Sequence, residues 1–312
     1  MSTAIRNPTT YWCPPVHHTV SEQTDPSNTT LHKPFVAVII GSSRGIGRVT
    51  GISYARAGAS GIVLTGRQQD TLSAAVADVR DAATCPGVDV RGVQCDVCSD
   101  ADLQRLADEV KQHFGRIDAL VVNAGVTTTP LKNPDGTEDW PKTVQQLDLA
   151  DFRKTFEVNL FAVVGALKYL VPLVEAAGTN AEGGDGWQSP QSVIVVTSSS
   201  LHNYDPKLMA MGYSLSKYAA ARMTEYVHEG HKEKGVCAFA IQPGTVMTVL
   251  TNRTTVAIDD IGLGGGLCVW LSKEKREWLS GRYIDARWDL EELTRRKDDI
   301  VTKDLLKLRM MM

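Results

Sequence analysis

The chain has 312 residues, of which 43% are hydrophobic and 22% are charged, and its formal net charge is -3 at pH 7. This composition is typical of a globular protein and argues against nucleic acid as a partner and against an acidic disordered tail. No apolar run reaches the roughly 18 residues of a membrane span, so we expect no membrane partner and a cytoplasmic location.

Residues 1–33 are polar and rich in Thr, Pro and His. They have neither the apolar core of a signal peptide nor the Arg-rich amphipathic pattern of a transit peptide. We expect a flexible N-terminal extension, or an arm that contacts a partner subunit. We interpret His17 and His18 within this segment as incidental.

Continuous apolar runs alternate with amphipathic stretches from residue 35 onward. The runs predict strands that are buried on both faces, and the 3.6-residue spacing between them predicts helices. In the first half, the predicted strands are 35–40, 61–65, 88–95 and 118–122, and the predicted helices are 46–57, 70–83 and 100–114.

The second half repeats this alternation. Its predicted helices are 151–177, 211–233 and one that includes 267–272, its predicted strands are 192–197, 236–241 and 282–285, and 290–312 forms a C-terminal helix or tail. Strands that alternate with helices through right-handed crossovers predict an α/β protein with one domain at residues 34–289. We expect a doubly wound Rossmann fold whose seven-stranded sheet is mostly parallel and flanked by helices.

Three segments are irregular in pattern, namely 127–143, 178–190 and 248–266. The first and third follow the carboxyl ends of predicted strands, where ligands bind in open α/β sheets. We expect the first to shape the mouth of a substrate site. The second precedes a strand and should therefore lie at the opposite edge. Within the third, the glycine cluster 262–266 is interpreted as a hinge or a helix entry.

The six cysteines include one C-x-x-C pair, formed by Cys95 and Cys98. Because no second pair completes a four-ligand site, we expect no metal centre, and we interpret the pair as inert. Scattered single cysteines are typical of a reducing compartment.

A glycine-rich loop lies between the first strand and the first helix, with the sequence Gly41-Ser-Ser-Arg-Gly45-Ile-Gly47. The first glycine allows a tight turn, the second allows close approach to a pyrophosphate, and the third allows the helix to pack on the strand. Backbone N–H groups at a helix start attract phosphates. We therefore count Gly41, Ser43, Arg44, Gly45, Ile46 and Gly47 as cofactor-binding residues.

The end of the second strand indicates which nucleotide binds. An acidic residue there would bind the ribose 2′-hydroxyl and repel a 2′-phosphate, but the sequence is Thr65-Gly66-Arg67. Arg67, together with Arg44 in the glycine-rich loop, can instead pair with a 2′-phosphate. The pattern favours NADP(H) as the cofactor.

Tyr213 and Lys217 lie one helical turn apart on one face of a predicted helix. Alone, this spacing also fits a half-buried Tyr beside an extended Lys. The helix, however, follows a strand that ends in a run of serines at 198–200. This context indicates a catalytic pair.

With these features, the sequence resembles the short-chain dehydrogenase/reductase family. The resemblance runs from about Pro34 to about Asp289. The matching residues, in chain order, are Gly41, Gly45, Gly47, Asp96-Val97, Asn123-Ala124-Gly125, Asn159, the serine cluster, Tyr213, Lys217 and Pro243-Gly244-Thr245-Val246-Met247-Thr248.

The resemblance implies catalytic roles. Tyr213 would donate a proton to a carbonyl oxygen, or accept it in reverse, and Lys217 would lower the phenol pKa from about 10 and hold the nicotinamide ribose. Asn159 would hold a water that links Lys217 to solvent. A serine would orient the substrate oxygen: strand register favours Ser199, whereas counting back from Tyr213 gives Ser200.

The resemblance also implies further contacts to the cofactor. Asp96 and Val97 would line the adenine, and Asn123, Ala124 and Gly125 would support the central strand and the cofactor. Pro243, Gly244, Val246 and Thr248 would lie against the nicotinamide. The sequence departs from the family pattern at Ile40, where Thr is usual, and at Val122, where Asn is frequent.

The expected function is interconversion of a ketone and a secondary alcohol with NADP(H), on a hydrophobic small molecule or secondary metabolite. The apolar residues Val249, Leu250, Ile258 and Ile261 carry that substrate prediction. The alternatives are an epimerase or dehydratase on the same fold, and a non-catalytic nucleotide-binding regulatory protein. The family's usual homodimer or homotetramer would form on helices 151–177 and 211–233.

Overall fold

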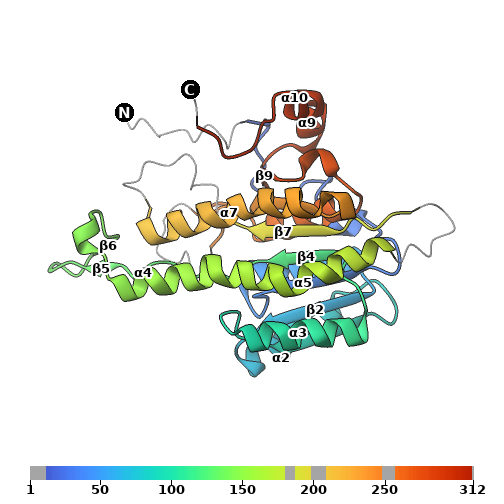
Figure 1. Ribbon diagram of the computed structural model, residues 1–312, viewed down its shortest axis with the longest axis horizontal. Helices are drawn as coiled ribbons and strands as arrows, with labels where there is room; N and C mark the ends of the chain where they lie inside the picture. The colour runs from blue at the N-terminus through green and yellow to red at the C-terminus, as the bar shows by residue number, and fades with distance from the viewer. Residues whose placement is uncertain (1–11, 180–186, 198–208, 248–256, 311–312) are drawn as a thin grey trace.

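The structure is a computed structural model, and it describes residues 12–179, 187–197, 209–247 and 257–310. One sheet of seven strands, all parallel, has the order β3-β2-β1-β4-β7-β8-β9 (Figure 1). The strands are β1 Val36–Ile40, β2 Gly61–Gly66, β3 Asp89–Gln94, β4 Ala119–Val122, β7 Ser192–Val196, β8 Cys237–Gln242 and β9 Arg282–Asp285. The predicted doubly wound fold is confirmed.

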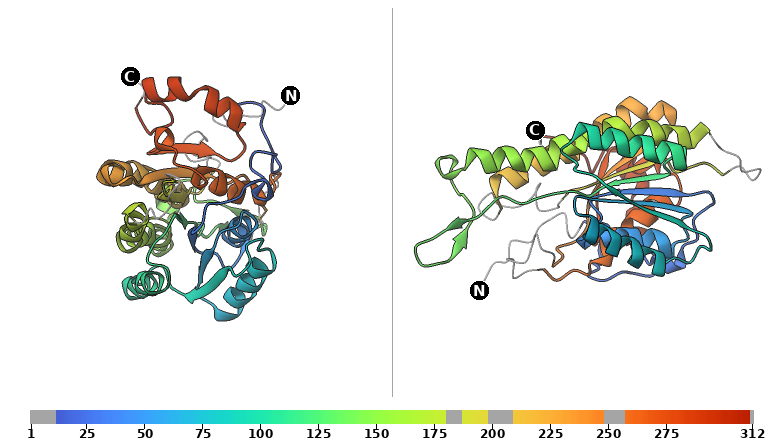
Figure 2. Two further views of the ribbon diagram at one scale, coloured as in Figure 1. Left: turned by 90° about the vertical axis from the view of Figure 1, so that its right-hand side faces the viewer. Right: turned by 90° about the horizontal axis from the view of Figure 1, so that it is seen from below.

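Helices cover both faces of the sheet (Figure 2). Ala37 and Ile39 of β1 face one core with α1, α2 and α8, whereas Val38 and Ile40 face the other with α3, α5 and α7. Alternate residues of a strand point to opposite faces, so a continuous apolar run serves both cores. These helices are α1 Gly45–Arg56, α2 Gln69–Asp81, α3 Asp100–His113, α5 Ala162–Thr179, α7 Met211–His231 and α8 Gly262–Ser272.

The long helix predicted at 151–177 is interrupted. It consists of α4 (Leu149–Phe156), a π-helical turn (Glu157–Phe161) and α5, which accommodates Pro172. By length and composition alone the stretch Leu149–Gly178 could cross a membrane, but half of its most apolar window is buried inside the protein. The core helix of a soluble protein can have the same length and composition. Here α5 packs on α3 and on β4.

Segment 127–143 contains a small antiparallel hairpin, formed by β5 (Leu131–Lys132) and β6 (Glu138–Asp139). It projects from the end of the molecule to which the arrows of β2 and β4 point, beside α4 (Figure 1). Thr129 anchors its base, because its N–H and hydroxyl both donate to Asp151, at 3.0 and 2.6 Å. The hairpin thus stands at the ligand-binding edge of the sheet.

The structure differs from the expected flexible extension at residues 12–33, which pack on the domain. Cys13 and Leu31 are buried, and Trp12 packs on Trp288 with ring centroids 5.4 Å apart. Burial raises the pKa of the Cys13 thiol to about 12. The segment is polar in composition, so the sequence did not indicate that its few apolar residues pack into the core of the domain.

Of the two interpretations of the glycine cluster 262–266, the helix entry is confirmed and the hinge is not, since α8 begins at Gly262. A Cβ at Gly264 would lie 2.7 Å from the Pro243 Cβ, and one at Gly266 would overlap the carbonyl oxygen of Thr24. The glycines therefore let α8 approach neighbouring backbone closely. The C-terminal part forms two short helices, α9 Leu290–Arg295 and α10 Lys297–Thr302, whose residues Leu290, Leu293 and Ile300 are buried.

The C-x-x-C pair is split between interior and surface. Cys95 is buried and Cys98 is exposed, and burial raises the pKa of the Cys95 thiol to about 11. That thiol is therefore protonated at neutral pH, which suits a packing residue. Across the described ranges, no group of three His, Cys, Asp or Glu side chains is arranged to hold a metal ion.

Candidate active site

The glycine-rich loop makes a turn that side chains would block. Gly41 and Gly45 have φ angles of +76° and +57°, in the left-handed region that favours glycine. A Cβ at Gly47 would overlap the carbonyl oxygen of Gly41 and would lie 2.6 Å from Asn123 Nδ2. A Cβ at Gly41 would lie 2.8 Å from the Ala124 Cα. The backbone of the turn therefore carries no side chains at these positions and packs directly against neighbouring backbone.

Hydrogen bonds from neighbouring strands fix this turn. The Gly41 N–H donates to Thr65 Oγ1 at 2.9 Å, and the Thr65 N–H donates to Ser42 Oγ at 2.8 Å. Asn123 Nδ2 donates to the Gly41 carbonyl at 2.8 Å. Thr65 and Ser42 thus supply the polar anchors of the turn, and Ile40 can remain a core residue of β1.

Helix α1 starts at Gly45 with its N-terminus directed at the loop, and no side chain caps this end within the described structure. The first N–H groups of a helix have no partner in the helix itself and carry the positive end of its dipole. Such an end can bind an anion such as a phosphate. Ser43 and Ile46 are half-buried here, so the backbone between them lies at the protein surface.

Arg44 and Arg67 lie at the same edge of the sheet, and both are exposed. A Cβ at Gly66 would lie 2.7 Å from the Ser43 Cβ, so the loop packs directly on the end of β2. Gln94 Nε2 donates to the Arg67 carbonyl at 2.9 Å and holds that backbone against β3. The two guanidinium groups therefore extend from adjacent, fixed positions.

The residues after β3 lie beside those after β2, because the two strands are neighbours. Asp96 is exposed, its N–H donates to Asp102 Oδ2 at 2.8 Å, and its Oδ1 accepts the Cys98 N–H at 3.1 Å. Val97 is half-buried. Asp96 and Val97 thus form a short ordered wall at the carboxyl edge of the sheet.

Lys217 is a buried cation on α7. Its Nζ donates to the Val196 carbonyl at the end of β7, at 3.0 Å, and only 4% of the residue is exposed. Burial lowers the pKa of the ammonium group from its ordinary value to about 8. A Cβ at Gly125 would lie 3.1 Å from this Nζ, so the glycine leaves the space in front of the ammonium open.

Asn159 lies in the π-helical turn and is fully buried. Its Oδ1 accepts the Val126 N–H at 2.8 Å, and its Nδ2 donates to the Val126 carbonyl at 2.9 Å and to Ser216 Oγ at 3.1 Å. The side chain therefore ties the loop after β4 to α7. The bound water that the resemblance assigns to Asn159 stays a prediction.

Tyr213 lies in the first turn of α7, one turn before Lys217, and is half-buried. Ser216 Oγ donates to the Tyr213 carbonyl at 2.9 Å, which links this turn to Asn159. Ser199, Ser200 and Thr248 lie outside the described residues, so the choice between the two serines stays open.

The loop after β8 completes the edge. Pro243 and Gly244 are buried, and Gly244 has a φ of +104°. The Thr245 N–H donates to Asp259 Oδ2 at 2.5 Å, and Val246 forms a parallel bridge with Asp259. The structure thus brings the described predicted residues to one edge of the sheet, at the ends of β1 to β4, β7 and β8.

Sequence reasoning missed four residues that organise this edge. Ser216 lies within the Tyr213–Lys217 motif, and Val126 directly follows the Asn123-Ala124-Gly125 motif, so position in a motif could have indicated both. Asp259 carries no such signal, since it lies in a segment of irregular pattern. The interpretation of His18 as incidental is corrected by the structure, because His18 Nδ1 lies 2.5 Å from Asp259 Oδ1.

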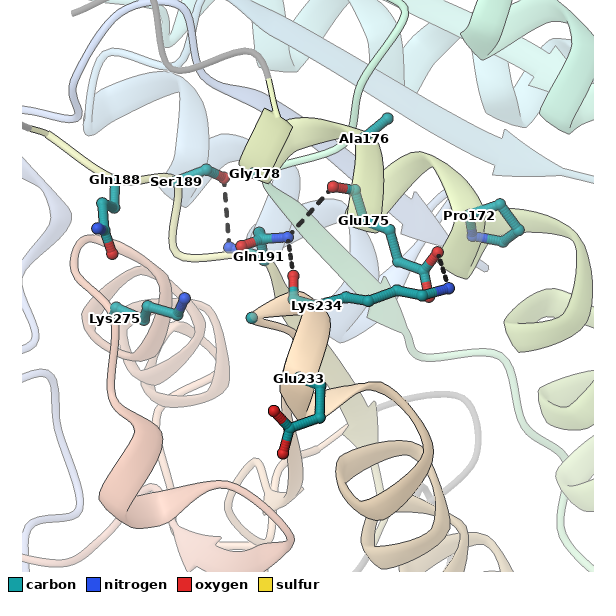
Figure 3. Close-up of a pocket in the computed structure, with 11 residues that line it drawn as sticks. Pro172, Glu175, Ala176, Gly178, Gln188, Ser189, Gln191, Glu233, Lys234 and Lys275 are labelled. Carbon is teal, nitrogen blue, oxygen red and sulfur yellow. Dashed lines mark hydrogen bonds and ion pairs between the residues drawn. The ribbon is translucent and has the colours of Figure 1, made fainter.

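A cavity of about 710 Å³ lies at the opposite edge of the sheet, around the amino ends of β7 and β8 (Figure 3). Gln191 lines it and donates from Nε2 to three carbonyls, including that of Lys234 at 3.0 Å, while Lys234 pairs with Glu175 at 2.9 Å. This cavity is separate from the Tyr213 and Lys217 edge.

The family model described as short chain dehydrogenase matches residues 35–258. A short chain dehydrogenase of Aspergillus terreus, pgmD, is 31% identical over 303 residues, which cover 94% of this chain and 92% of that protein. A short chain dehydrogenase of Monascus purpureus, mpl6, is 32% identical over 282 residues, which cover 88% of each chain.

Solved structures show the same fold. A short-chain type dehydrogenase/reductase from Mycobacterium ulcerans aligns with a TM-score of 0.67 and 19% identity, over 82% of this chain and 89% of that one. A 7α-hydroxysteroid dehydrogenase, solved with NADH and 7-oxo glycochenodeoxycholic acid, aligns with a TM-score of 0.65 and 23% identity, over 86% and 96%. From the family match and the extent of the identities, this chain belongs to the short-chain dehydrogenase/reductase family, whose members are nicotinamide-dependent oxidoreductases of small molecules.

Proposed function

We propose that the protein interconverts a ketone and a secondary alcohol with NADP(H), with Tyr213 and Lys217 as its catalytic pair. The observation that carries this proposal is the buried ammonium of Lys217, which lies one turn beyond Tyr213 and in front of Gly125. Burying an ammonium group costs free energy, and ionisable groups perturbed in this way are frequent at functional sites. Stabilising a phenolate is a function that such a buried ammonium can serve.

In this proposal, Tyr213 holds the proton that the reaction needs. Its hydroxyl would donate to the carbonyl oxygen during reduction and accept a proton from the alcohol during oxidation. The bound nicotinamide supplies or accepts the hydride at its C4 atom. Lys217 would stabilise the phenolate form of Tyr213, because a positive charge nearby lowers the pKa of a phenol.

The residues present fit a dinucleotide. The bare turn at Gly41, Gly45 and Gly47 and the uncapped start of α1 offer backbone N–H groups to the pyrophosphate. Lys217 can donate to ribose hydroxyls through the hydrogens of Nζ that do not bond to Val196, since an ammonium group has three. Pro243, Gly244 and Val246 would line the nicotinamide.

The choice of NADP(H) rests on Arg44 and Arg67, together with the lack of an acid at the end of β2. We predict that Arg67→Ala weakens NADPH binding about tenfold and changes NADH binding by less than about twofold, because only NADPH carries the 2′-phosphate. Titration of both cofactors by fluorescence measures this. Arg91→Ala removes a half-buried arginine of β3 that pairs with Asp89, and it serves as the control.

Equal effects of Arg67→Ala on the two cofactors would remove the argument for the phosphate. The argument for the phosphate would also fail if the unaltered protein bound NADH more tightly than NADPH. That result would not affect the proposed role of Tyr213 in proton transfer.

We propose a hydrophobic ketone or alcohol as the substrate, in keeping with a secondary metabolite. Met247, which directly follows the loop after β8, and Ile258, which directly precedes Asp259, are 56% and 66% exposed. The likeness to a 3β-hydroxysteroid dehydrogenase of Mediterraneibacter gnavus, which is 25% identical over 252 residues, supports a hydrophobic substrate.

We also propose a homodimer or homotetramer that buries the outer faces of α4, α5 and α7. Leu149, Phe161, Leu215 and Tyr226 on these helices and the π-helical turn are more than half exposed. Large exposed apolar side chains that gather on one set of elements favour association. Phe161→Glu is expected to shift the protein to monomers in analytical ultracentrifugation.

Val301→Glu, on α10, is the matched control and should leave the assembly intact. A wild-type protein that stays monomeric at every concentration, or an assembly that Phe161→Glu does not affect, would contradict this interface.

A further inference from the structure

A segment near the N-terminus runs along the ligand-binding edge of the sheet. The Cys13 carbonyl accepts the Asp289 N–H at 3.1 Å, and the His17 N–H donates to the Arg287 carbonyl at 2.8 Å. The His18 carbonyl accepts the Asp260 N–H at 2.8 Å. We call residues 13–18 the N-terminal strap, because their backbone connects the end of β9 to the start of α8.

The strap ends on a buried carboxylate. His18 Nδ1 lies 2.5 Å from Asp259 Oδ1, and the side chain of Asp259 is fully buried while that of His18 is 46% exposed. With Nδ1 as the donor, His18 satisfies one oxygen of this carboxylate. The other oxygen accepts the Thr245 N–H at 2.5 Å.

Asp259 therefore joins the strap to the loop after β8. That loop, Pro243 to Val246, is the part of the chain that would lie against the nicotinamide. Val246 also forms a bridge with Asp259, so backbone and side chain hold the same pair of segments together. The carboxylate fixes where the Thr245 amide lies.

The guanidinium group near Asp259 is engaged elsewhere. Arg287 Nη1 lies 3.9 Å from Asp259, beyond hydrogen-bond distance, whereas Arg287 donates to Asp285 from Nε at 2.9 Å and from Nη2 at 2.6 Å. A buried carboxylate needs hydrogen bonds to remain stable. Among the residues that the structure describes, His18 thus supplies the side-chain hydrogen bond that orients Asp259 toward Thr245.

We propose that His18 is a positioning residue for the nicotinamide half of the cofactor, acting through Asp259 on the loop 243–246. This inference rests on the proposed function, in that the loop must contact the nicotinamide. The adenosine half is held at the far side of the edge, by the ends of β1, β2 and β3. A fault in the loop should therefore weaken binding of the whole cofactor and spare its adenosine fragment.

The test is calorimetric binding of NADPH and of adenosine 2′,5′-bisphosphate, which lacks the nicotinamide, to His18→Ala, His18→Asn and the unaltered protein. We expect His18→Ala to weaken NADPH binding about tenfold and fragment binding by less than about twofold. Asn places an N–H donor near the position of Nδ1, so His18→Asn should restore most of the NADPH affinity. His17→Ala, which removes the side-chain contact of His17 to Asp289 at 3.2 Å, is the matched control.

Equal loss of both ligands, no loss of either, or an NADPH affinity that His18→Asn does not restore would each overturn the inference. Thermal unfolding of every variant separates a misfolded protein from a displaced loop. If the unaltered protein prefers NADH, the same comparison is made with NADH and ADP, so an error in the proposed cofactor does not affect this result.

Discussion

Tyr213→Phe is expected to lower kcat for ketone reduction about a thousandfold, because it removes the hydroxyl that exchanges a proton with the substrate oxygen. NADPH binding should change little, since the ring and the fold of α7 are retained. Steady-state kinetics with NADPH and a panel of hydrophobic ketones, read from nicotinamide absorbance, measure the loss.

Tyr169→Phe is the matched control for this prediction. It removes a hydroxyl that accepts from Lys168 Nζ at 3.3 Å on α5, and it should retain full activity. Activity that is preserved in Tyr213→Phe would exclude this phenol as the proton donor.

Lys217→Met should lower the activity of the protein and raise its stability. Turnover is expected to fall about a hundredfold, because the phenol of Tyr213 loses the charge that stabilises its ionised form. The fold should become more stable at pH 7, because Met removes a cation whose burial lowers its pKa to about 8. Both kinetics and thermal unfolding are measured on the same samples.

The sign and pH range of the stability effect follow from the pKa. The ordinary value of 10.5 applies to the unfolded chain, and the folded value is about 8, so the burial penalty is fully present below pH 8 and fades toward pH 10.5. At ~1.4 kcal/mol per pKa unit, the shift corresponds to a burial penalty of roughly 3 kcal/mol, which Lys217→Met removes. Loss of the hydrogen bond to Val196 offsets about 1 kcal/mol of this gain in stability. Tm should rise by about 3–6 °C at pH 7.

At pH 10.5 the gain in Tm should be largely lost. A Lys217→Met protein that is less stable than the wild type at pH 7, or a gain that is the same at both pH values, would contradict this account of the buried ammonium.

The fold was predictable because each of its layers has a local signal. The runs at β1, β2 and β4 are apolar without interruption, and only a strand covered on both faces needs such a run. The glycine spacing at Gly41, Gly45 and Gly47 marks the junction of the first strand and the first helix, and the later strands and helices follow from it in chain order. Each of these signals is contained within a few consecutive residues, so the sequence displays it directly.

The predictions that differ from the structure concern contacts between distant segments. The π-helical turn interrupts a continuous helical pattern, and its Asn159 contacts Val126, 33 residues away. His18 and Asp259 are separated by 241 residues. No local periodicity indicates such pairs. A polar N-terminal segment with only a few apolar residues has the composition of a mobile segment, even when those residues are buried.

The central claim is that hydride passes between the nicotinamide and a substrate carbon while Tyr213 exchanges the proton. The direct measurement uses NADPH deuterated at the transferred C4 position, a reactive ketone, and mass spectrometry of the product. The account predicts one deuterium on the carbinol carbon for each NADPH consumed, and a matching loss of product in Tyr213→Phe. Product that forms without deuterium while the cofactor stays reduced, as for an epimerase or dehydratase, would contradict it.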